Sequence, residues 1–209
     1  MPPKRAVVYI DGFNLFHGLK DKGWKRYYWL DPCMLACNLL PANPAMLLDQ
    51  VHYFTAPVLQ GRGKDAARRQ QIYLDALATL PQLTIHHGKW VNKTIQCRQC
   101  GAAWKSPEEK MSDVNIAVQL VVDAYENSFD TAFLVSADSD LTGPIQTVRE
   151  RFPDKEVRVA FPPKRRSWDL ANTAHVQFPI GEKKFRSSQL PTQVTNAHGH
   201  VLQRPVTWH

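Results

Sequence analysis

The sequence has no apolar run approaching the roughly 18–20 residues that would span a bilayer. Its first residues, Met-Pro-Pro-Lys-Arg, lack the apolar stretch and small-residue cleavage site of a signal peptide. We therefore expect a cytoplasmic protein with no membrane partner. Cysteine is also scarce, and in a reducing compartment cysteines more often bind metal or remain thiols than form disulfides. The four cysteines are Cys33, Cys37, Cys97 and Cys100.

The composition excludes a chain that is mostly disordered, because 44% of the residues are hydrophobic and 22% are charged. A length of 209 residues suits one domain with room for an appended segment. Lys and Arg number 26 against 19 Asp and Glu, which leaves a net charge of +7. A basic surface suits a nucleic acid, but it also suits an ordinary soluble protein, so the charge alone does not decide.

Short β-branched and aromatic runs alternate with helical patterns along the chain. We predict strands at 6–11, 51–57, 83–90, 131–138, 157–162 and 175–180, and helices at 31–40, 65–80, 112–127 and 141–152. This alternation predicts a three-layer α/β/α sandwich around a mainly parallel central sheet. The helix at 112–127 is apolar nearly all round, so we expect it to be well buried, with Ser112 as its N-cap.

Two segments depart from this alternation. Residues 92–108 lack the periodicity of core elements and are interpreted as an insertion or long loop that carries Cys97-Arg-Gln-Cys100. Residues 185–209 are polar and contain two prolines, which is typical of a disordered tail or of an extended segment on the body. The predicted organisation is a domain over 1–184 with that insertion, followed by an extension over 185–209.

Acidic residues mark the boundaries of three predicted elements. Asp11 ends the first strand, Asp113 lies in the first turn of a helix, and Asp138 and Asp140 follow the fourth strand. The carboxyl ends of parallel strands meet at one edge of a sheet, so these carboxylates are expected to converge there. Such a cluster repels itself unless a cation neutralises it, and Mg²⁺ is suited to carboxylate ligands and substrate phosphates. Each aspartate alone has an ordinary explanation as a cap, turn or helix-dipole residue.

Three motifs resemble those of a known family. They are Val8-Tyr-Ile-Asp11-Gly-Phe-Asn14-Leu15, Glu109-Lys110-Met-Ser-Asp113-Val-Asn-Ile-Ala117 and Leu134-Val-Ser136-Ala-Asp138-Ser-Asp140-Leu141. In their order and spacing they are similar to the acidic motifs of NYN-domain proteins, the LabA-like branch of the PIN-like nuclease superfamily. The resemblance covers roughly 6–180. The ending, Ser188–Pro191 with Pro205–Trp208, also resembles the family and favours an ordered C-terminal segment.

The resemblance implies a PIN-like fold and an endoribonuclease that depends on Mg²⁺ or Mn²⁺ and cleaves single-stranded or structured RNA. It implies that water is the nucleophile and that the products carry 5′-phosphate and 3′-hydroxyl ends. Asn14 would hold Asp11 or a phosphate oxygen, and Ser136 would donate a hydrogen bond to a carboxylate. The metal ligands it implies are Asp11, Asp113 and Asp138, directly or through water, with Asp140 as a fourth ligand or as an organiser of metal-bound water.

Basic residues near the predicted strand ends are candidates for contact with RNA. Lys110 lies three residues before Asp113, the acid of the second motif, where it could approach a phosphate. The run Lys164-Arg165-Arg166 lies beside Trp168, a combination of charge and a stacking ring that suits single-stranded RNA. Both groups are equally well explained as solvated loop residues.

Cys97-x-x-Cys100-Gly101 resembles a zinc knuckle, in which two thiolates flank a tight turn. A structural Zn²⁺ site needs four ligands, and Cys33 and Cys37 share one face of a predicted helix, so a composite four-cysteine site is one interpretation. His86 and His87 are alternative partners. The other interpretation is that the helical pair are buried thiols.

Two other function classes stay open. A non-catalytic RNA-binding or regulatory module would retain the fold without the chemistry. A phosphatase of small phosphate esters is disfavoured. One common class has an Asp-x-Asp pair at the end of its first strand, and here Asp11 is followed by Gly12 and Phe13, so the second Asp is absent. The sequence leaves the oligomeric state open, a homodimer included.

Overall fold

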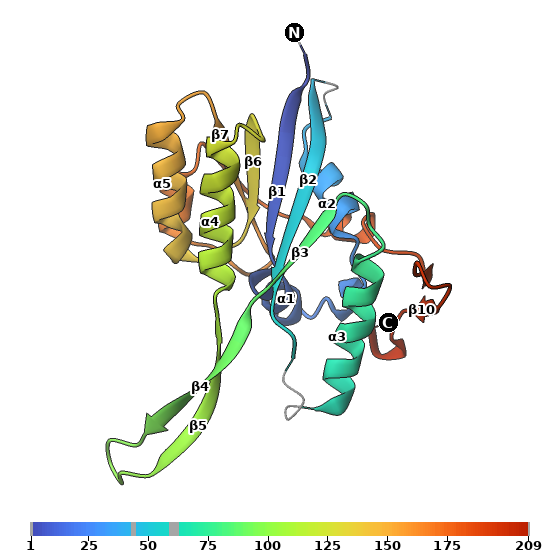
Figure 1. Ribbon diagram of the computed structural model, residues 1–209, viewed down its shortest axis with the longest axis vertical. Coiled ribbons are helices and arrows are strands. Elements are labelled where there is room, and N and C mark those ends of the chain that lie inside the picture. Colours follow the sequence, from blue (N-terminus) through green and yellow to red (C-terminus); the bar gives the residue numbers. More distant parts are fainter. Residues whose placement is uncertain (1, 43–44, 59–62, 209) are drawn as a thin grey trace.

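A six-stranded parallel sheet, in the order β3-β2-β1-β6-β7-β8, organises the chain (Figure 1). The structure is a computed structural model that describes residues 2–42, 45–58 and 63–208. Each strand pairs in parallel with its neighbours, which confirms the predicted mainly parallel sheet. The strands are β1 (Lys4–Asp11), β2 (Met46–Thr55), β3 (Leu83–His87), β6 (Thr131–Val135), β7 (Glu156–Phe161) and β8 (Val176–Pro179).

Helices cover both faces of the sheet, as the predicted three-layer sandwich requires (Figure 1). On β1, Val8 and Ile10 point into one core and Val7 and Tyr9 into the other, because successive strand residues face opposite sides. The first core is covered by α1 (Gly12–Asp21), α2 (Pro32–Leu39), α3 (Lys64–Leu77) and α7 (Glu182–Arg186). The second core is covered by α4 (Ser112–Tyr125), α5 (Thr142–Arg151) and α6 (Trp168–Thr173).

Helix α4 differs from its sequence-based prediction in two ways. Ser112 is the first helical residue and not the N-cap, and Met111 occupies the cap position with a left-handed φ of 85°. The helix is not buried all round either. Val114 and Val118 are 59% and 56% exposed, and Tyr125 is exposed as well. The sequence-based prediction failed because only one face of α4 meets the sheet, while the opposite face is apolar in sequence and remains open.

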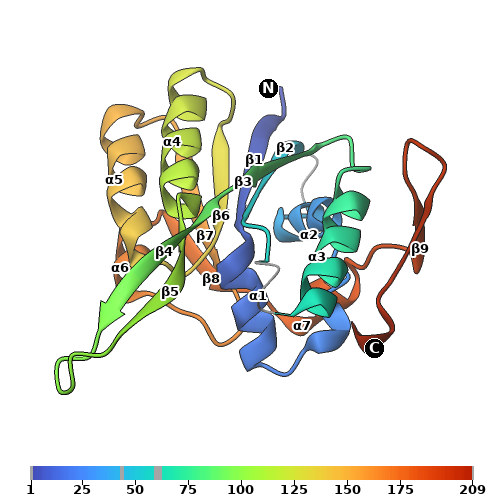
Figure 2. The same ribbon diagram turned by 60° about the horizontal axis from the view of Figure 1, so that its bottom comes forward.

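The predicted insertion at 92–108 forms an antiparallel hairpin. Its strands are β4 (Lys89–Gln96) and β5 (Ala103–Lys110), and it projects from the body of the molecule (Figures 1 and 2). The expected long loop is therefore wrong. The strands were not recognised because most of their described side chains are exposed, so no buried face imposes an alternating apolar pattern on the sequence.

The C-terminal segment is ordered and packs on the body. It contains α7, which spans the boundary placed at 184 in the sequence, then β9 (Gln193–Thr195), β10 (Val201–Gln203) and the 3₁₀ turn Val206–Trp208. Trp208 is buried against the rings of Tyr28, Trp29 and Tyr73. Among the described residues, no helix has both the length and the apolar character needed to cross a membrane.

A buried polar network ties β1, β2 and β3 to α4. The Tyr9 hydroxyl donates to Asp123 Oδ2 at 2.6 Å, and His52 Nε2 lies 3.4 Å from the same oxygen. The other nitrogen of His52 lies 2.9 Å from His86 Nε2, and Gln119 donates to Asp123 Oδ1 at 2.8 Å. Burial acts to raise the pKa of Asp123, but the hydrogen bonds from His52, Tyr9 and Gln119 outweigh burial and hold its pKa below the ordinary value.

We predict that Asp123→Asn lowers the free energy of unfolding at pH 7 by about 1–3 kcal/mol, because a buried charged hydrogen-bond acceptor is lost. A depressed carboxylate pKa stabilises the fold above the unfolded-state pKa of about 4, and this contribution disappears as the pH falls through the folded value. The difference between variant and wild type should therefore shrink below pH 4.

Urea denaturation across pH measures this effect. Asp75→Asn is the matched control, since Asp75 also accepts from a glutamine four residues earlier, Gln71, but on an exposed helix surface. It should change stability by less than about 0.5 kcal/mol. Equal losses for the two variants would show that the buried network contributes nothing beyond a helical Gln–Asp pair.

Candidate functional site

Asp11 lies at the carboxyl end of β1 and is also the N-cap of α1. Its Oδ1 accepts from the backbone N–H of Asn14 at 2.9 Å, which starts the helix directly behind the strand. Gly12 is required here, because a Cβ at this position would lie 2.7 Å from the carbonyl oxygen of Phe54. Strand, glycine and helix together fix the carboxylate at the edge of the sheet.

Two further side chains hold the second oxygen of Asp11. Its Oδ2 accepts from the Asn14 amide at 3.0 Å and from the Ser136 hydroxyl at 2.8 Å. Burial raises the pKa of Asp11, and Asp138 adds to that rise, while the hydrogen bonds from Asn14 and Ser136 counteract it without cancelling it. The carboxylate of Asp11 is thus both buried and held in a single orientation.

Asp138 and Asp140 lie on the turn that follows β6. Asp138 caps the 3₁₀ turn Ser139–Leu141, with its Oδ1 accepting from the Asp140 N–H at 3.0 Å. The Asp138 N–H donates to Ser136 Oγ at 3.1 Å, so Ser136 connects the turn to Asp11. Asp138 is half-buried and Asp140 is exposed.

Asp113 joins this group from the first turn of α4. Its pKa is raised from 3.8 to about 6, first by burial and then by the charges of Asp138, Asp11, Glu109 and Asp140, in that order. Mutual repulsion of this kind requires that the carboxylates lie near one another. The structure therefore brings Asp11, Asp113, Asp138 and Asp140 into one electrostatic group, which we call the acidic cluster.

Glu109 is a further carboxylate beside the acidic cluster, and the sequence reasoning left it without a role. It lies near the end of β5, and its Oε1 accepts from the Ser112 hydroxyl at 2.7 Å and from the Ser112 N–H at 3.3 Å. A Cβ at Gly88 would collide with this carboxylate, so the glycine leaves the space that Glu109 occupies. The sequence offered one signal for this residue, because Glu109 lies four residues before Asp113 in the same acidic motif.

The donor set fits a hard divalent cation, because it consists of carboxylates that destabilise each other when ionised. Among the described residues, however, no group of three or more His, Cys, Asp or Glu side chains is arranged to hold a metal ion together. Mg²⁺ usually keeps several waters and takes only one or two carboxylates directly. The acidic cluster is therefore suited to a hydrated ion and not to a cage of protein ligands alone.

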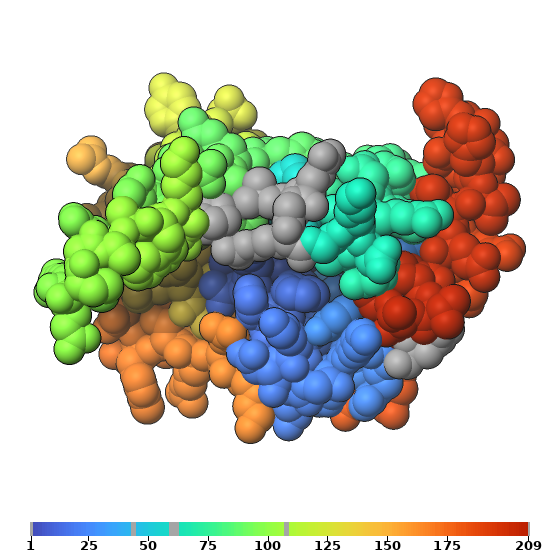
Figure 3. Space-filling view, turned by 90° about the horizontal axis from the view of Figure 1, so that it is seen from below, coloured from blue at the N-terminus to red at the C-terminus, as the bar shows by residue number. Residues whose placement is uncertain are grey.

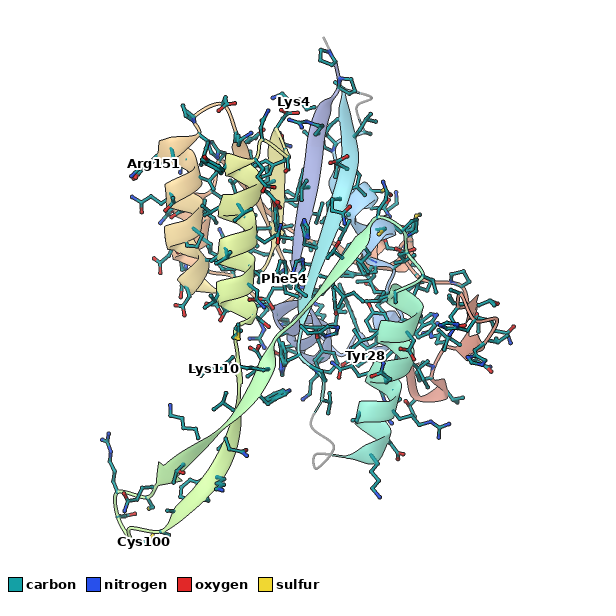
Figure 4. The ribbon with its side chains drawn as sticks, viewed as in Figure 1. Lys4, Tyr28, Phe54, Cys100, Lys110 and Arg151 are labelled. Carbon is teal, nitrogen blue, oxygen red and sulfur yellow. The ribbon has the colours of Figure 1, made fainter. Side chains whose placement is uncertain are left out.

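The predicted RNA-contacting residues lie on segments that meet this edge of the sheet, because residues 164–168 follow the carboxyl end of β7 and Lys110 lies just before α4. Figure 3 views the molecule from below, the side on which the strands end. Arg166 stacks over the ring of Trp168 at 4.7 Å, and Trp168 is 71% exposed. Arg165 instead pairs with Asp21 at 2.5 Å. Lys164 is exposed in the turn after β7, and Lys110 ends β5 at the base of the hairpin (Figure 4).

The structure does not bring the four cysteines together. Cys97 and Cys100 lie at the tip of the hairpin, far from α2, which carries Cys33 and Cys37 (Figures 1 and 4). Cys33 packs against the core, and burial raises its pKa to about 12, as expected for an inert thiol.

A composite four-cysteine site within one chain is therefore not formed. The alternative partners, His86 and His87, end β3 at the base of the hairpin rather than at its tip.

A separate cavity of about 350 Å³ opens beside the start of α1. Aromatic side chains dominate its described lining, and the charged side chains among them are basic. The aromatic residues are Phe13, Phe16, Tyr28, Tyr53, Tyr73, Trp90 and Trp208, and the charged ones are Lys25 and Arg69. His17 also lines the cavity, but burial lowers its pKa and so disfavours its charged form. Its size and lining suit a planar, negatively charged small molecule or a nucleobase with its phosphate.

Comparison with known proteins gives three findings. The family model described as NYN domain matches residues 5–180. The 6-hydroxy-3-succinoylpyridine 3-monooxygenase HspA of Pseudomonas putida (strain DSM 28022 / S16) is 28% identical over an alignment 246 residues long. The alignment covers 99% of this chain and 76% of that relative. A protein of unknown function from Vibrio parahaemolyticus RIMD 2210633, VPA0982, has a similar structure, with a TM-score of 0.57 at 16% identity over 90% of this chain and 97% of that one. This structural likeness shows the fold alone.

We predict that Asp113→Asn stabilises the metal-free protein at pH 8 by about 1 kcal/mol, a value reduced for the solvent screening of a half-buried group. The raised pKa of Asp113 means that the folded state holds its proton more tightly than the unfolded state between about pH 4 and pH 6. The wild type therefore loses stability across this window as the pH rises, and the advantage of the variant should fade towards pH 4.

Urea denaturation in EDTA measures the difference. Asp65→Asn is the matched control, because Asp65 also lies in the first turn of a helix but is exposed and outside the acidic cluster. It should be neutral or slightly destabilising. A destabilised Asp113→Asn protein at pH 8 would show that repulsion within the acidic cluster is negligible.

Proposed function

Because this chain belongs to the NYN domain family, we propose that it is a metal-dependent endoribonuclease of the PIN-like kind. The observation that carries the proposal is the acidic cluster, in which the neighbouring carboxylates help to raise the pKa of Asp113 to about 6. Unlike a set of separate helix caps, such a group gains stability when a divalent cation binds. The net charge of +7 supports a polyanionic substrate.

Each residue of the site has a proposed task. Asp11, Asp113 and Asp138 would hold Mg²⁺ or Mn²⁺ directly or through water, and Asp140 would be a further ligand or would organise water bound to the ion. Asn14 and Ser136 would keep Asp11 in place through the hydrogen bonds described above. When bound, the cation supplies an activated water and charge stabilisation at a phosphodiester, so the expected ends are 5′-phosphate and 3′-hydroxyl.

The RNA would approach along the edge that carries the basic residues. Trp168 offers an exposed ring for base stacking, and Arg166, already stacked on that ring, offers a positive charge. Lys164 and Lys110 would contact phosphates on either side of the acidic cluster. Arg165 has a different task in this scheme, because its ion pair with Asp21 fixes the turn after β7 against α1.

We predict Mg²⁺- or Mn²⁺-dependent cleavage of labelled single-stranded or structured RNA, which EDTA abolishes. Ser136→Ala should lower the rate by about 10–100-fold, as is usual for a partner that orients a metal ligand. Asp138→Asn should lower it further, because it removes a ligand itself. Asp154→Asn, at an exposed position in the turn before β7, is the matched control and should cleave at the wild-type rate.

Two results would contradict the nuclease proposal. One is the absence of metal-dependent cleavage on a broad RNA panel. The other is cleavage that Asp138→Asn leaves unchanged. RNA binding that survives both EDTA and Asp138→Asn would then favour a non-catalytic RNA-binding or regulatory module with the same fold.

A second candidate function is favoured by the aromatic cavity. The Pseudomonas relative is named as a monooxygenase of a hydroxypyridine that carries a carboxylate-ended chain. A cavity of about 350 Å³ with aromatic walls and with Arg69 and Lys25 in its lining suits a molecule of this kind. This candidate is the monooxygenation of a small aromatic acid bound in that cavity, which would take O₂ and a two-electron reductant, place one oxygen atom on the substrate and release the other as water.

Titration with 6-hydroxy-3-succinoylpyridine, followed by tryptophan fluorescence, tests this second candidate, since Trp90 and Trp208 line the cavity. Arg69→Gln should weaken binding by at least about tenfold, because a charged hydrogen bond to the carboxylate is lost. Arg68→Gln, at the exposed neighbouring position, should leave binding unchanged. No saturable response, or equal effects of both variants, would remove this candidate.

A further inference from the structure

The tip of the β4–β5 hairpin forms a compact turn around two cysteines. The strands stay in register up to the pair Gln96 and Ala103. The turn is closed by the Cys97 N–H donating to the Ala102 carbonyl at 2.8 Å and the Gly101 N–H donating to the Cys97 carbonyl at 3.0 Å. Gly101 has a left-handed φ of 69°, a conformation that glycine adopts without strain. The turn is therefore a defined structure.

The two sulfur atoms converge at this tip. The Cys97 sulfur accepts hydrogen bonds from the backbone N–H groups of Cys100 and Gln99 and from the Cys100 thiol. Cys100 is exposed and marks the outermost part of the hairpin (Figure 4). Two cysteine sulfurs held beside each other on an accessible turn have the donor chemistry that Zn²⁺ binds.

A single chain supplies only half of such a site. Structural Zn²⁺ is almost always bound by four ligands in a tetrahedron. In the described part of the chain, no third His, Cys, Asp or Glu is placed with this pair to hold a metal. Cys33 and Cys37 lie on α2, and the hairpin holds its tip away from the body (Figures 1 and 2). A four-ligand site at this tip would therefore take its other two ligands from another molecule.

We propose that one Zn²⁺ joins the hairpin tips of two copies of this chain, with Cys97 and Cys100 of each copy as its four ligands. Four thiolates on Zn²⁺ carry a net charge of −2. The exposed Arg98 of each tip supplies one compensating positive charge. A second copy satisfies the coordination with no other component.

The sides of the hairpin provide a surface that the second copy would cover. Ile95 and Trp104 are directly paired across the strands, and Val91 projects from the same face as Ile95. All three side chains are exposed, Trp104 by 50%. An apolar strip of this kind is unusual on a projecting two-stranded hairpin, and contact with a second hairpin would remove it from water.

Zinc titration of the full, reduced chain tests the proposal. After removal of bound metal with a chelator, metal bound by thiolate should saturate at 0.5 equivalent per chain, and added Zn²⁺ should convert monomer to dimer in sedimentation and native mass spectrometry. Co²⁺ in place of Zn²⁺ should give the charge-transfer absorption of a tetrahedral thiolate site. Cys100→Ser should abolish both effects, whereas the matched control Cys37→Ser, exposed on α2, should abolish neither.

A further variant tests the apolar surface. Trp104→Ala should weaken the zinc-dependent dimer by roughly tenfold while the cysteines remain intact. The readouts are thiolate absorption and dimer formation, neither of which depends on RNA cleavage, so a failure of this proposal is separate from a failure of the proposed nuclease. One thiolate-bound Zn²⁺ per monomer, a dimer that ignores Zn²⁺, or no binding at the cysteines would overturn the proposal.

Discussion

The parallel pairing of β1 with β6 brings together two carboxylates that lie more than a hundred residues apart in sequence. Asp11 and Asp138 follow adjacent strand ends, and Ser136 holds both, donating to Asp11 Oδ2 and accepting from the Asp138 N–H. The fold forces like charges together here, and α4 adds Asp113 to them. Repulsion between these carboxylates therefore lowers the stability of the metal-free fold at this edge, as is usual at a site that binds a cation.

Local chemistry made much of this arrangement predictable. The end of β1 at Asp11 and the capped helix at Asp31 follow from short-range patterns, and the parallel sheet follows from the alternation of elements. The fourth strand, however, ends at Val135 and not at Asp138 as predicted, because Asp138 caps the 3₁₀ turn that follows it. The hairpin was missed because its exposed strands carry no core pattern. The contacts between Tyr9, His52 and Asp123 were missed because they join three distant segments, and Glu109 because its role depends on Ser112 and on the other acids in space.

Two binding features share this region of the fold. Gly12 and Phe13 follow Asp11 directly and line the aromatic cavity, so the acidic cluster and the cavity begin within two residues of each other. A nuclease could use the cavity for a base, while an oxygenase would place a small aromatic acid there. The fold does not choose between them, since one architecture supports several chemistries. The chemistry of the acidic cluster favours the nuclease, because carboxylates held close together need a cation.

Anomalous diffraction from crystals grown with Mn²⁺ tests the role of the acidic cluster most directly. The account predicts a Mn²⁺ peak within bonding distance of at least one carboxylate among Asp11, Asp113 and Asp138, with waters completing the shell. Crystals of Asp113→Asn should show the peak weakened or lost. A fully ordered acidic cluster with no peak at millimolar Mn²⁺, or a peak bound only elsewhere on the molecule, would contradict the central claim that these carboxylates form a metal site.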